Sequence, residues 1–196
     1  VPYLAHIAME PLSCIAVPGD GSWDIYSGTQ NLTRSTDTSA DFLGLPSDAV
    51  TIHPTSLGGS FGRRLGYDLE IRAIEIARAV NAPVKAIWAR EDDVRHDFYR
   101  PMVAADFKAA LNGAGSLDSL EIRLAGQPWP TLRQDGMDPS VMGAIDEMPY
   151  DFPNLRLAYV RVDSPVPIGT WRSVPRSYNT LIVECIIDGL AAAAGV

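Results

Sequence analysis

The sequence predicts an α+β fold in which a mixed β-sheet is covered by helices packed on it. Short β-branched runs and segments of helical periodicity are mixed along the chain without strict alternation. The 196 residues can bury a substantial core, and 46% apolar with 20% charged residues is typical of globular proteins. The chain opens on "VPYLAH", which reads as the middle of a protein. We therefore expect residues 1–196 to form a single domain that is part of a larger subunit.

The N-terminal part predicts a hairpin, a helix and a strand. Residues 12–28 place two apolar runs on either side of the turn "PGDG", which indicates a β-hairpin. Residues 30–44 have loose helical spacing, with Gly44 and Pro46 as stop signals. Residues 49–55 are rich in β-branched side chains and predict a strand.

A second helix is expected after the glycine-rich turn that follows this strand. Asp68 is a candidate N-cap, and Asn81 with Pro83 ends the helix. Residues 84–90 predict the next strand, which leads into the acidic residues 91–93 of a solvated loop or a hydrogen-bonding corner. The apolar face of the helix is expected to consist of Leu69, Ala73, Ile76, Ala77 and Val80.

The C-terminal part predicts a second group of strands and a final helix. In residues 102–126, "NGAG" followed by the alternating "LEIRL" favours two antiparallel strands. Residues 127–153 lack periodicity, which is typical of a functional or interfacial segment. Residues 154–162 predict a strand. Residues 178–194 predict a helix that is apolar on most sides and therefore buried.

Charge and composition exclude two classes of partner. The net charge of −8 and the pI near 4.8 argue against a nucleic-acid surface, which needs a basic patch. Glu184 and Asp188 interrupt the longest apolar run, so no membrane span is expected. Two local basic pairs in an acidic chain instead indicate a small anionic ligand: Arg63 with Arg64, and Arg172 with Arg176.

Neither the cysteines nor the histidines form a metal signature. Cys14 and Cys185 are expected to be buried small apolar residues. His6, His53 and His96 have no mutual ligand spacing, and we expect His96 to be buried and hydrogen-bonded.

The stretch "TSLGGSFGRR" (55–64) is the segment of the sequence that points most directly to a binding site. A glycine loop between a strand and a helix offers free backbone N–H groups, and this makes it a site for a phosphate or an oxyanion. Gly58, Gly59 and Gly62 match neither the GxxxxGK(S/T) nor the GxGxxG phosphate loop. The segment alone therefore indicates either an anion or cofactor site, or a tight turn with solvated arginines.

Two further turns, which we call corners, also lie directly before an expected helix. Gln30 in "YSGTQ" follows a strand and precedes a helix, and Arg172 in "GTWRSVPRS" precedes the final helix. Taken singly, the first is typical of a cap and the second of a surface cation. If the helices pack on one sheet, the three loops converge on a common crevice, where ligands bind in such folds.

Five motifs together resemble the molybdenum-binding large subunit of the xanthine oxidase/aldehyde oxidase family, in its bacterial isoquinoline 1-oxidoreductase and aldehyde dehydrogenase branch. They cover nearly the whole chain in the family's order: "AHIAMEPLSCIAV", "YSGTQ", "GGSFGRR", "VKAIWAREDDVRHDFYRPM" and "GTWRSVPRSYNTLIVECIIDGLA". The resemblance implies a molybdopterin cofactor, usually the cytosine dinucleotide in bacteria, and a reaction that adds a water-derived oxygen to an aldehyde or N-heterocycle. It also implies a partner subunit with [2Fe-2S] clusters, and a flavin or cytochrome subunit as a further carrier, in the bacterial cytoplasm or periplasm.

The resemblance also assigns roles to residues. Gln30 matches the glutamine that hydrogen-bonds an oxygen ligand of molybdenum, and Phe61 with Gly62 matches the pair whose backbone amide approaches that ligand. No residue of this chain is expected to ligate the metal directly. The expected cofactor-binding residues are Gln30, Gly59, Ser60, Phe61, Gly62, Arg63, Arg172 and Ser173, and the expected substrate-pocket residues are Trp171 and Val174.

Several positions depart from the family pattern. Leu65 stands near the glutamate of purine-hydroxylating members, and Val174 replaces their stacking phenylalanine, so an aldehyde or a larger aromatic heterocycle is favoured over a purine. The family's catalytic glutamate is expected beyond Val196, so this chain alone should not turn over substrate. Glu10 is expected to be structural. The rival hypotheses are a stand-alone α+β module that binds an anion or nucleotide without redox activity, and a purely structural or interaction domain.

Overall fold

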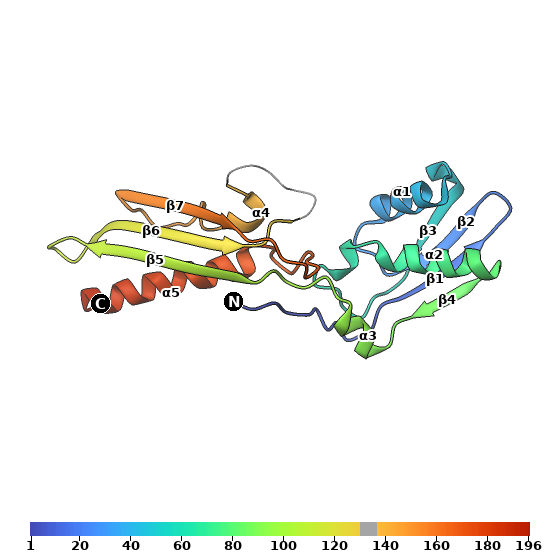
Figure 1. Ribbon diagram of the computed structural model, residues 1–196, viewed down its shortest axis with the longest axis horizontal. Helices are drawn as coiled ribbons and strands as arrows, with labels where there is room; N and C mark the ends of the chain where they lie inside the picture. The colour runs from blue at the N-terminus through green and yellow to red at the C-terminus, as the bar shows by residue number, and fades with distance from the viewer. Residues whose placement is uncertain (130–136) are drawn as a thin grey trace. The chain divides into compact units, whose positions relative to one another are not determined.

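The computed structural model describes residues 1–129 and 137–196, and it divides the chain into two compact units (Figure 1). The first, which we call the loop unit, consists of Ala5–Tyr99 and Gly169–Trp171. The second, which we call the α5 unit, consists of Val1–Leu4, Arg100–Ile168 and Arg172–Val196. Each unit has its own sheet and its own hydrophobic core.

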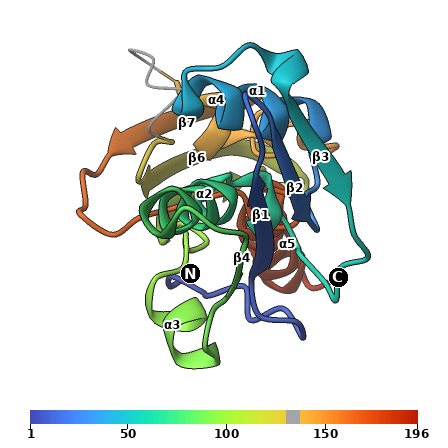
Figure 2. The same ribbon diagram turned by 90° about the vertical axis from the view of Figure 1, so that its right-hand side faces the viewer.

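The sheet of the loop unit is mixed and has the strand order β3-β2-β1-β4, which can be followed in Figure 2. The predicted hairpin is confirmed, because β1 and β2 pair antiparallel across the "PGDG" turn. β4 runs antiparallel to β1, whereas β3 runs parallel to β2. The strands are β1 (Ser13–Pro18), β2 (Trp23–Ser27), β3 (Val50–Pro54) and β4 (Val84–Ile87).

Two helices, α1 (Leu32–Leu43) and α2 (Asp68–Val80), share one core with this sheet. Asn31 caps α1 by accepting a hydrogen bond from the Arg34 N–H at 3.1 Å, and Gly44 ends it in the left-handed conformation, with φ 70°. The core combines Trp23 with small and medium side chains, among them Cys14, Ala16, Ile25, Ala40, Val50, Leu69, Ala73, Ile74 and Ala77.

Helix α2 differs from the prediction at its start and on its buried face. Tyr67, and not the predicted Asp68, is the N-cap, and it makes no side-chain cap hydrogen bond. The Asp68 carboxylate accepts two hydrogen bonds from Arg63 instead of capping the helix. Ile76 and Val80 are 47% and 57% exposed, so their predicted burial is wrong. The buried face of α2 is rotated towards Glu70 and Ile74. It includes a glutamate, which a search for apolar residues at helical spacing does not find. The buried set is Leu69, Glu70, Ala73, Ile74 and Ala77.

The acidic residues 91–93 were expected in a solvated loop or a hydrogen-bonding corner, and they form the first turn of helix α3 (Arg90–Arg95). Three carboxylates at a helix N-terminus are favourable, because the free N–H groups give that end a partial positive charge. Asp93 is buried and lies 2.7 Å from the Arg90 guanidinium. Strand β4 accordingly ends at Ile87, earlier than the predicted residue 90.

The α5 unit has a three-stranded sheet of order β5-β6-β7 (Figure 1). β5 (Val103–Leu111) and β6 (Leu117–Gly126) form the expected antiparallel pair, and β7 (Asn154–Arg161) runs parallel to β6. Helices α4 (Pro139–Met142) and α5 (Arg176–Ala194) contribute to the core of this unit. The expected α+β class is therefore confirmed, with two mixed sheets where one was expected.

Helix α5 is buried along one stripe only, so the prediction of burial on most sides is wrong. Leu181 is 56% exposed, and Cys185 is exposed although it was expected to be buried. Cys14 is buried as predicted, whereas His96 is exposed and was expected to be buried. No helix among the described residues is both long and apolar enough to cross a membrane. The buried stripe of α5 consists of Tyr178, Asn179, Val183 and Ile186.

Glu70 sets a pH dependence for the stability of the loop unit. Its Oε1 accepts a hydrogen bond from the Ser27 hydroxyl at 2.7 Å, while its buried Oε2 has no partner among the described residues. Burial raises the pKa of Glu70 in the folded protein. Because the folded pKa lies above the unfolded pKa, the protonated side chain favours the folded state. The free energy of unfolding therefore falls as pH rises from the unfolded pKa to the folded pKa, by about 1.4 kcal/mol for each pH unit in that window.

We expect Glu70→Gln to flatten this dependence, since the amide keeps an acceptor for Ser27 and never ionises. Urea unfolding between pH 4 and pH 8 measures the effect. Equal slopes of unfolding free energy against pH in the two proteins would contradict the assignment.

Candidate functional site

The glycine loop between β3 and the 3₁₀ helix Arg63–Leu65 has an unusual backbone. Gly59 and Gly62 have φ of 99° and 104°, and Phe61, which is not a glycine, has φ of 56°. A Cβ on Gly62 would lie 2.2 Å from the Thr170 carbonyl oxygen, so only glycine fits there. A left-handed phenylalanine beside it is strained, and such strain concentrates at functional sites.

Gln30 joins this loop through its side chain. The Gly62 N–H donates to Gln30 Oε1 at 3.2 Å, and the Ser60 hydroxyl donates to the same oxygen. The Gln30 N–H in turn donates to the Arg64 carbonyl at 3.0 Å. The expected convergence of the glutamine corner and the glycine loop is therefore present. It arises because β2 and β3 are parallel neighbours, so the loops after them leave the same edge of the sheet.

The loop offers unpaired N–H groups. The Gly58 N–H donates to Glu10 Oε2 at 2.7 Å, and the Gly62 N–H is taken by Gln30. By contrast, the N–H groups of the three residues between them, 59–61, donate to no residue that the structure describes. Consecutive free amides in a glycine-rich turn are a site for an anion or another acceptor.

Arg64 and Glu10 hold the glycine loop in place through hydrogen bonds to its backbone. Arg64 Nη2 lies 3.0 Å from Glu10 Oε2, and Arg64 Nε donates to the Gly59 carbonyl at 3.3 Å. Burial raises the pKa of Glu10, but the Gly58 N–H and the Arg64 charge outweigh it, so the net pKa is lowered. Glu10 is thus a structural anchor in this structure, as the sequence suggested.

Arg63 is also used internally. Its guanidinium makes two hydrogen bonds to the Asp68 carboxylate, at 2.8 and 2.7 Å, and lies over the Phe98 ring at 4.8 Å. Its Nε is 2.8 Å from Asp97 Oδ1, an ion pair in which the N–H is not aimed at the oxygen. The interpretation of Arg63 and Arg64 as solvated cations is therefore wrong, and the acceptor-binding capacity of the loop rests on its amides.

Sequence reasoning missed a buried cluster around Asp97. His6 Nδ1 lies 3.0 Å from Asp97 Oδ2, and His6 Nε2 lies 2.8 Å from the Thr170 carbonyl oxygen. The His6 ring packs on Trp171, with 4.6 Å between ring centroids. The cluster thus fastens Gly169–Trp171 to the glycine loop. The pairing of an aspartate in "RHDFYRP" with a histidine 91 residues earlier has no local signal.

Three of the remaining expected site residues, Arg172, Ser173 and Val174, lie in the α5 unit. Arg172 is exposed, and Ser173 and Val174 have φ of 68° and 53°. The Ser173 carbonyl accepts the Arg176 N–H at 3.0 Å, at the start of α5. A β-branched residue with positive φ is a genuine outlier, so this turn is strained like the glycine loop. Trp171 belongs to the loop unit.

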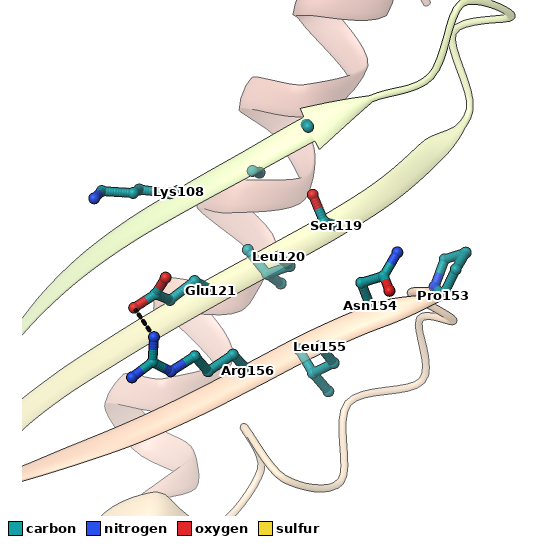
Figure 3. Close-up of a pocket in the computed structure, with 10 residues that line it drawn as sticks. Lys108, Ser119, Leu120, Glu121, Pro153, Asn154, Leu155 and Arg156 are labelled. Atoms are coloured by element: carbon teal, nitrogen blue, oxygen red, sulfur yellow. Dashed lines mark ion pairs between the residues drawn. The ribbon is translucent and has the colours of Figure 1, made fainter.

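The α5 unit also has a hollow of about 600 Å³, which Figure 3 shows on its sheet. Lys108, Glu121 and Arg156 lie side by side on β5, β6 and β7, and Glu121 Oε1 is 3.5 Å from Arg156 Nη1. The hollow is wide open and lies on regular strands, of which the central one, β6, is paired on both sides, whereas the glycine loop carries three consecutive N–H groups that donate to no described residue. We therefore place the candidate site at the glycine loop.

The chemistry available at the glycine loop is hydrogen-bond donation. In residues 1–129 and 137–196, no group of three or more His, Cys, Asp or Glu side chains is placed to hold a metal ion. The loop amides and the Gln30 carboxamide nitrogen can bind an electron-rich acceptor group.

The family model of the molybdopterin cofactor-binding domain matches residues 1–196. The chain is 30% identical over 194 residues to the isoquinoline 1-oxidoreductase subunit beta of Brevundimonas diminuta, and 28% identical over 200 residues to a membrane-bound aldehyde dehydrogenase (pyrroloquinoline-quinone) of Gluconacetobacter polyoxogenes. These matches cover 93% and 95% of this chain but 24% and 26% of the relatives. The chain thus spans about a quarter of their length.

The fold is also found among solved structures. Quinoline 2-oxidoreductase from Pseudomonas putida 86 superposes with a TM-score of 0.85 at 21% sequence identity. The match covers 99% of this chain and 26% of that one. At this identity the likeness establishes the fold alone.

Gly62→Ala tests the close approach of Thr170 to the loop. We expect a loss of about 2–4 kcal/mol of unfolding free energy, because the methyl group adds a backbone clash to an unfavourable φ. Gly21→Ala is the matched control, since Gly21 has φ of 74° with open space around it. Urea unfolding of both variants gives the comparison, and equal losses would show that no close contact exists at Gly62.

Asp97→Ala tests the buried cluster. Removing this carboxylate leaves the buried Arg63 and His6 without one of their partners, and we expect a loss of about 3–5 kcal/mol. Glu75→Ala is the control in the same unit, because the Arg72–Glu75 pair is exposed and such pairs contribute little to stability. The two free energies are measured by chemical unfolding, and similar values for both variants would refute a stabilising cluster.

Proposed function

The chain belongs to the molybdopterin cofactor-binding domain family, and we propose that it is the cofactor-binding domain of a molybdenum hydroxylase. In this proposal the glycine loop and Gln30 bind acceptor atoms of the cofactor. The observation that carries it is the hydrogen bond from the Gly62 N–H to Gln30 Oε1, which joins the two predicted corners into one site.

The residues present fit a molybdopterin cofactor. Such a cofactor carries phosphate and other oxygen acceptors, and the loop offers N–H donors at Gly59, Ser60 and Phe61 that donate to no described residue. The Gln30 carboxamide adds donors at the same place, because its oxygen is occupied by the loop. The glycines let the backbone come close to a ligand.

When bound, the cofactor supplies the redox chemistry that adds a water-derived oxygen to the substrate carbon. Residues of this chain would hold and orient it through Gln30 Nε2 and the loop amides, which are fixed before binding and need no rearrangement. Phe61 is 45% exposed and Trp171 is half-buried, so both can provide apolar surface beside the loop. Arg172, Ser173 and Val174 are proposed as further cofactor- and substrate-binding residues, on the resemblance of their turn to the family motif.

We propose an aldehyde or an aromatic N-heterocycle as the substrate. The names of the relatives, an isoquinoline oxidoreductase subunit and an aldehyde dehydrogenase, support this class. We further propose the cytosine dinucleotide form of the cofactor, and [2Fe-2S] clusters on a partner subunit as the electron acceptor, with a flavin or cytochrome subunit beyond it. Elemental analysis for molybdenum in the full-length protein, purified with its partners, tests the proposal, and a protein free of molybdenum would count against it.

Gln30→Ala is expected to lower turnover about 10- to 100-fold, as for the loss of a hydrogen bond to a charged group, while molybdenum content stays close to that of the wild type. Gln30→Glu separates the two halves of the amide, since it keeps an acceptor for Gly62 and Ser60 but has no N–H donor. It should lose at least as much activity as the alanine variant. Full turnover in either variant would remove Gln30 from the mechanism.

A further inference from the structure

We propose that Ser60 is a positioning residue that fixes which end of the Gln30 carboxamide faces the ligand. Its hydroxyl holds Gln30 Oε1 against the loop, so that Nε2 is presented outward as a donor. This inference rests on the proposed function and adds a second residue to the same site.

The direction of the hydrogen bonds follows from the partners of Ser60. Its Oγ accepts the Arg64 N–H at 2.9 Å, so the single hydroxyl proton is left to donate elsewhere. The acceptor within reach among the described residues is Gln30 Oε1. Ser60 is only 5% exposed, so water competes poorly for this proton.

A second donor meets the same atom of Gln30. The Gly62 N–H points at Oε1 from 3.2 Å, and an amide nitrogen in that position would face two donors. The oxygen is therefore the only end of the carboxamide that satisfies both neighbours. Nε2 takes the opposite side, where no described residue accepts a hydrogen bond from it.

Backbone hydrogen bonds connect Gln30 and Ser60 through Arg64. The Gln30 N–H donates to the Arg64 carbonyl at 3.0 Å, and Arg64 supplies the N–H that orients Ser60. Gln30, Ser60 and Arg64 thus form one connected set of hydrogen bonds. Without the Ser60 hydroxyl, Oε1 keeps only the contact to Gly62, and rotation of the carboxamide by half a turn becomes accessible. A rotated amide presents oxygen to an acceptor-rich ligand and repels it.

The experiment uses the full-length protein purified with its partners. We expect Ser60→Ala to lower kcat about 3- to 10-fold, the change that one net hydrogen bond gives, with little change in KM. In the Gln30→Ala background, Ser60→Ala should cause no further loss, because Ser60 acts through Gln30. Ser39→Ala is the matched control: this serine is fully buried in α1, its hydroxyl has no partner among the described residues, and its removal should leave kcat unchanged.

A second readout does not depend on activity. With ¹⁵N-glutamine labelling, the Gln30 side-chain amide should give an ordered signal with a high ¹H–¹⁵N NOE in the wild type, and a mobile one in Ser60→Ala. An unchanged kcat in Ser60→Ala would overturn the proposal. So would a double variant in which Ser60→Ala lowers kcat by the same factor in the Gln30→Ala background as it does in the wild type. If Ser60→Ala does not fold, the wild-type signal decides, since a mobile Gln30 amide would overturn it as well. Absence of molybdenum would defeat the proposed function, while the NMR result would still decide the role of Ser60.

Discussion

Arg64 is the residue on which the geometry of the site depends. Its guanidinium reaches the Glu10 carboxylate and the Gly59 carbonyl, its N–H reaches Ser60 Oγ, and its carbonyl accepts the Gln30 N–H. One residue therefore links the N-terminal segment, the glycine loop and the glutamine corner. A buried cation is stable only when paired, so the loop conformation that pairs it is strongly favoured over alternatives that leave it unpaired.

The sheet topology brings the same elements together. Strands β2 and β3 are parallel, and their C-terminal ends release Gln30 and the glycine loop at one edge of the sheet. This explains why residues 30 and 62 meet although 32 positions separate them. The side-chain contacts then refine a proximity that the backbone already provides.

The elements themselves could be predicted from local patterns. The "PGDG" hairpin, the stop at Gly44 and the strand pair around "NGAG" follow from turn chemistry and periodicity, which need only neighbouring residues. The buried polar contacts could not. No residue near Asp97 in the sequence indicates that it pairs with His6. Glu70 has the sequence context of a solvent-facing helix residue, and only the folded structure places the Ser27 hydroxyl beside it. The exposed face of α5 was missed for a related reason. An apolar helix sequence favours burial, but whether a face is buried depends on which other elements pack against it, and the helix sequence does not contain that information.

The ligand chemistry of the loop follows from how its charges are used. The sequence indicated an anionic ligand both from its arginine pairs and from the N–H groups of the glycine loop, yet the guanidinium groups of Arg63 and Arg64 are paired with carboxylates within the loop unit. What remains available is a set of neutral N–H dipoles in an acidic chain. Such donors discriminate by hydrogen-bond polarity and distance, and they are screened little by salt because they carry no net charge. A site of this kind selects acceptor groups brought close by shape, which suits a cofactor carried by many contacts better than a free anion attracted from solution.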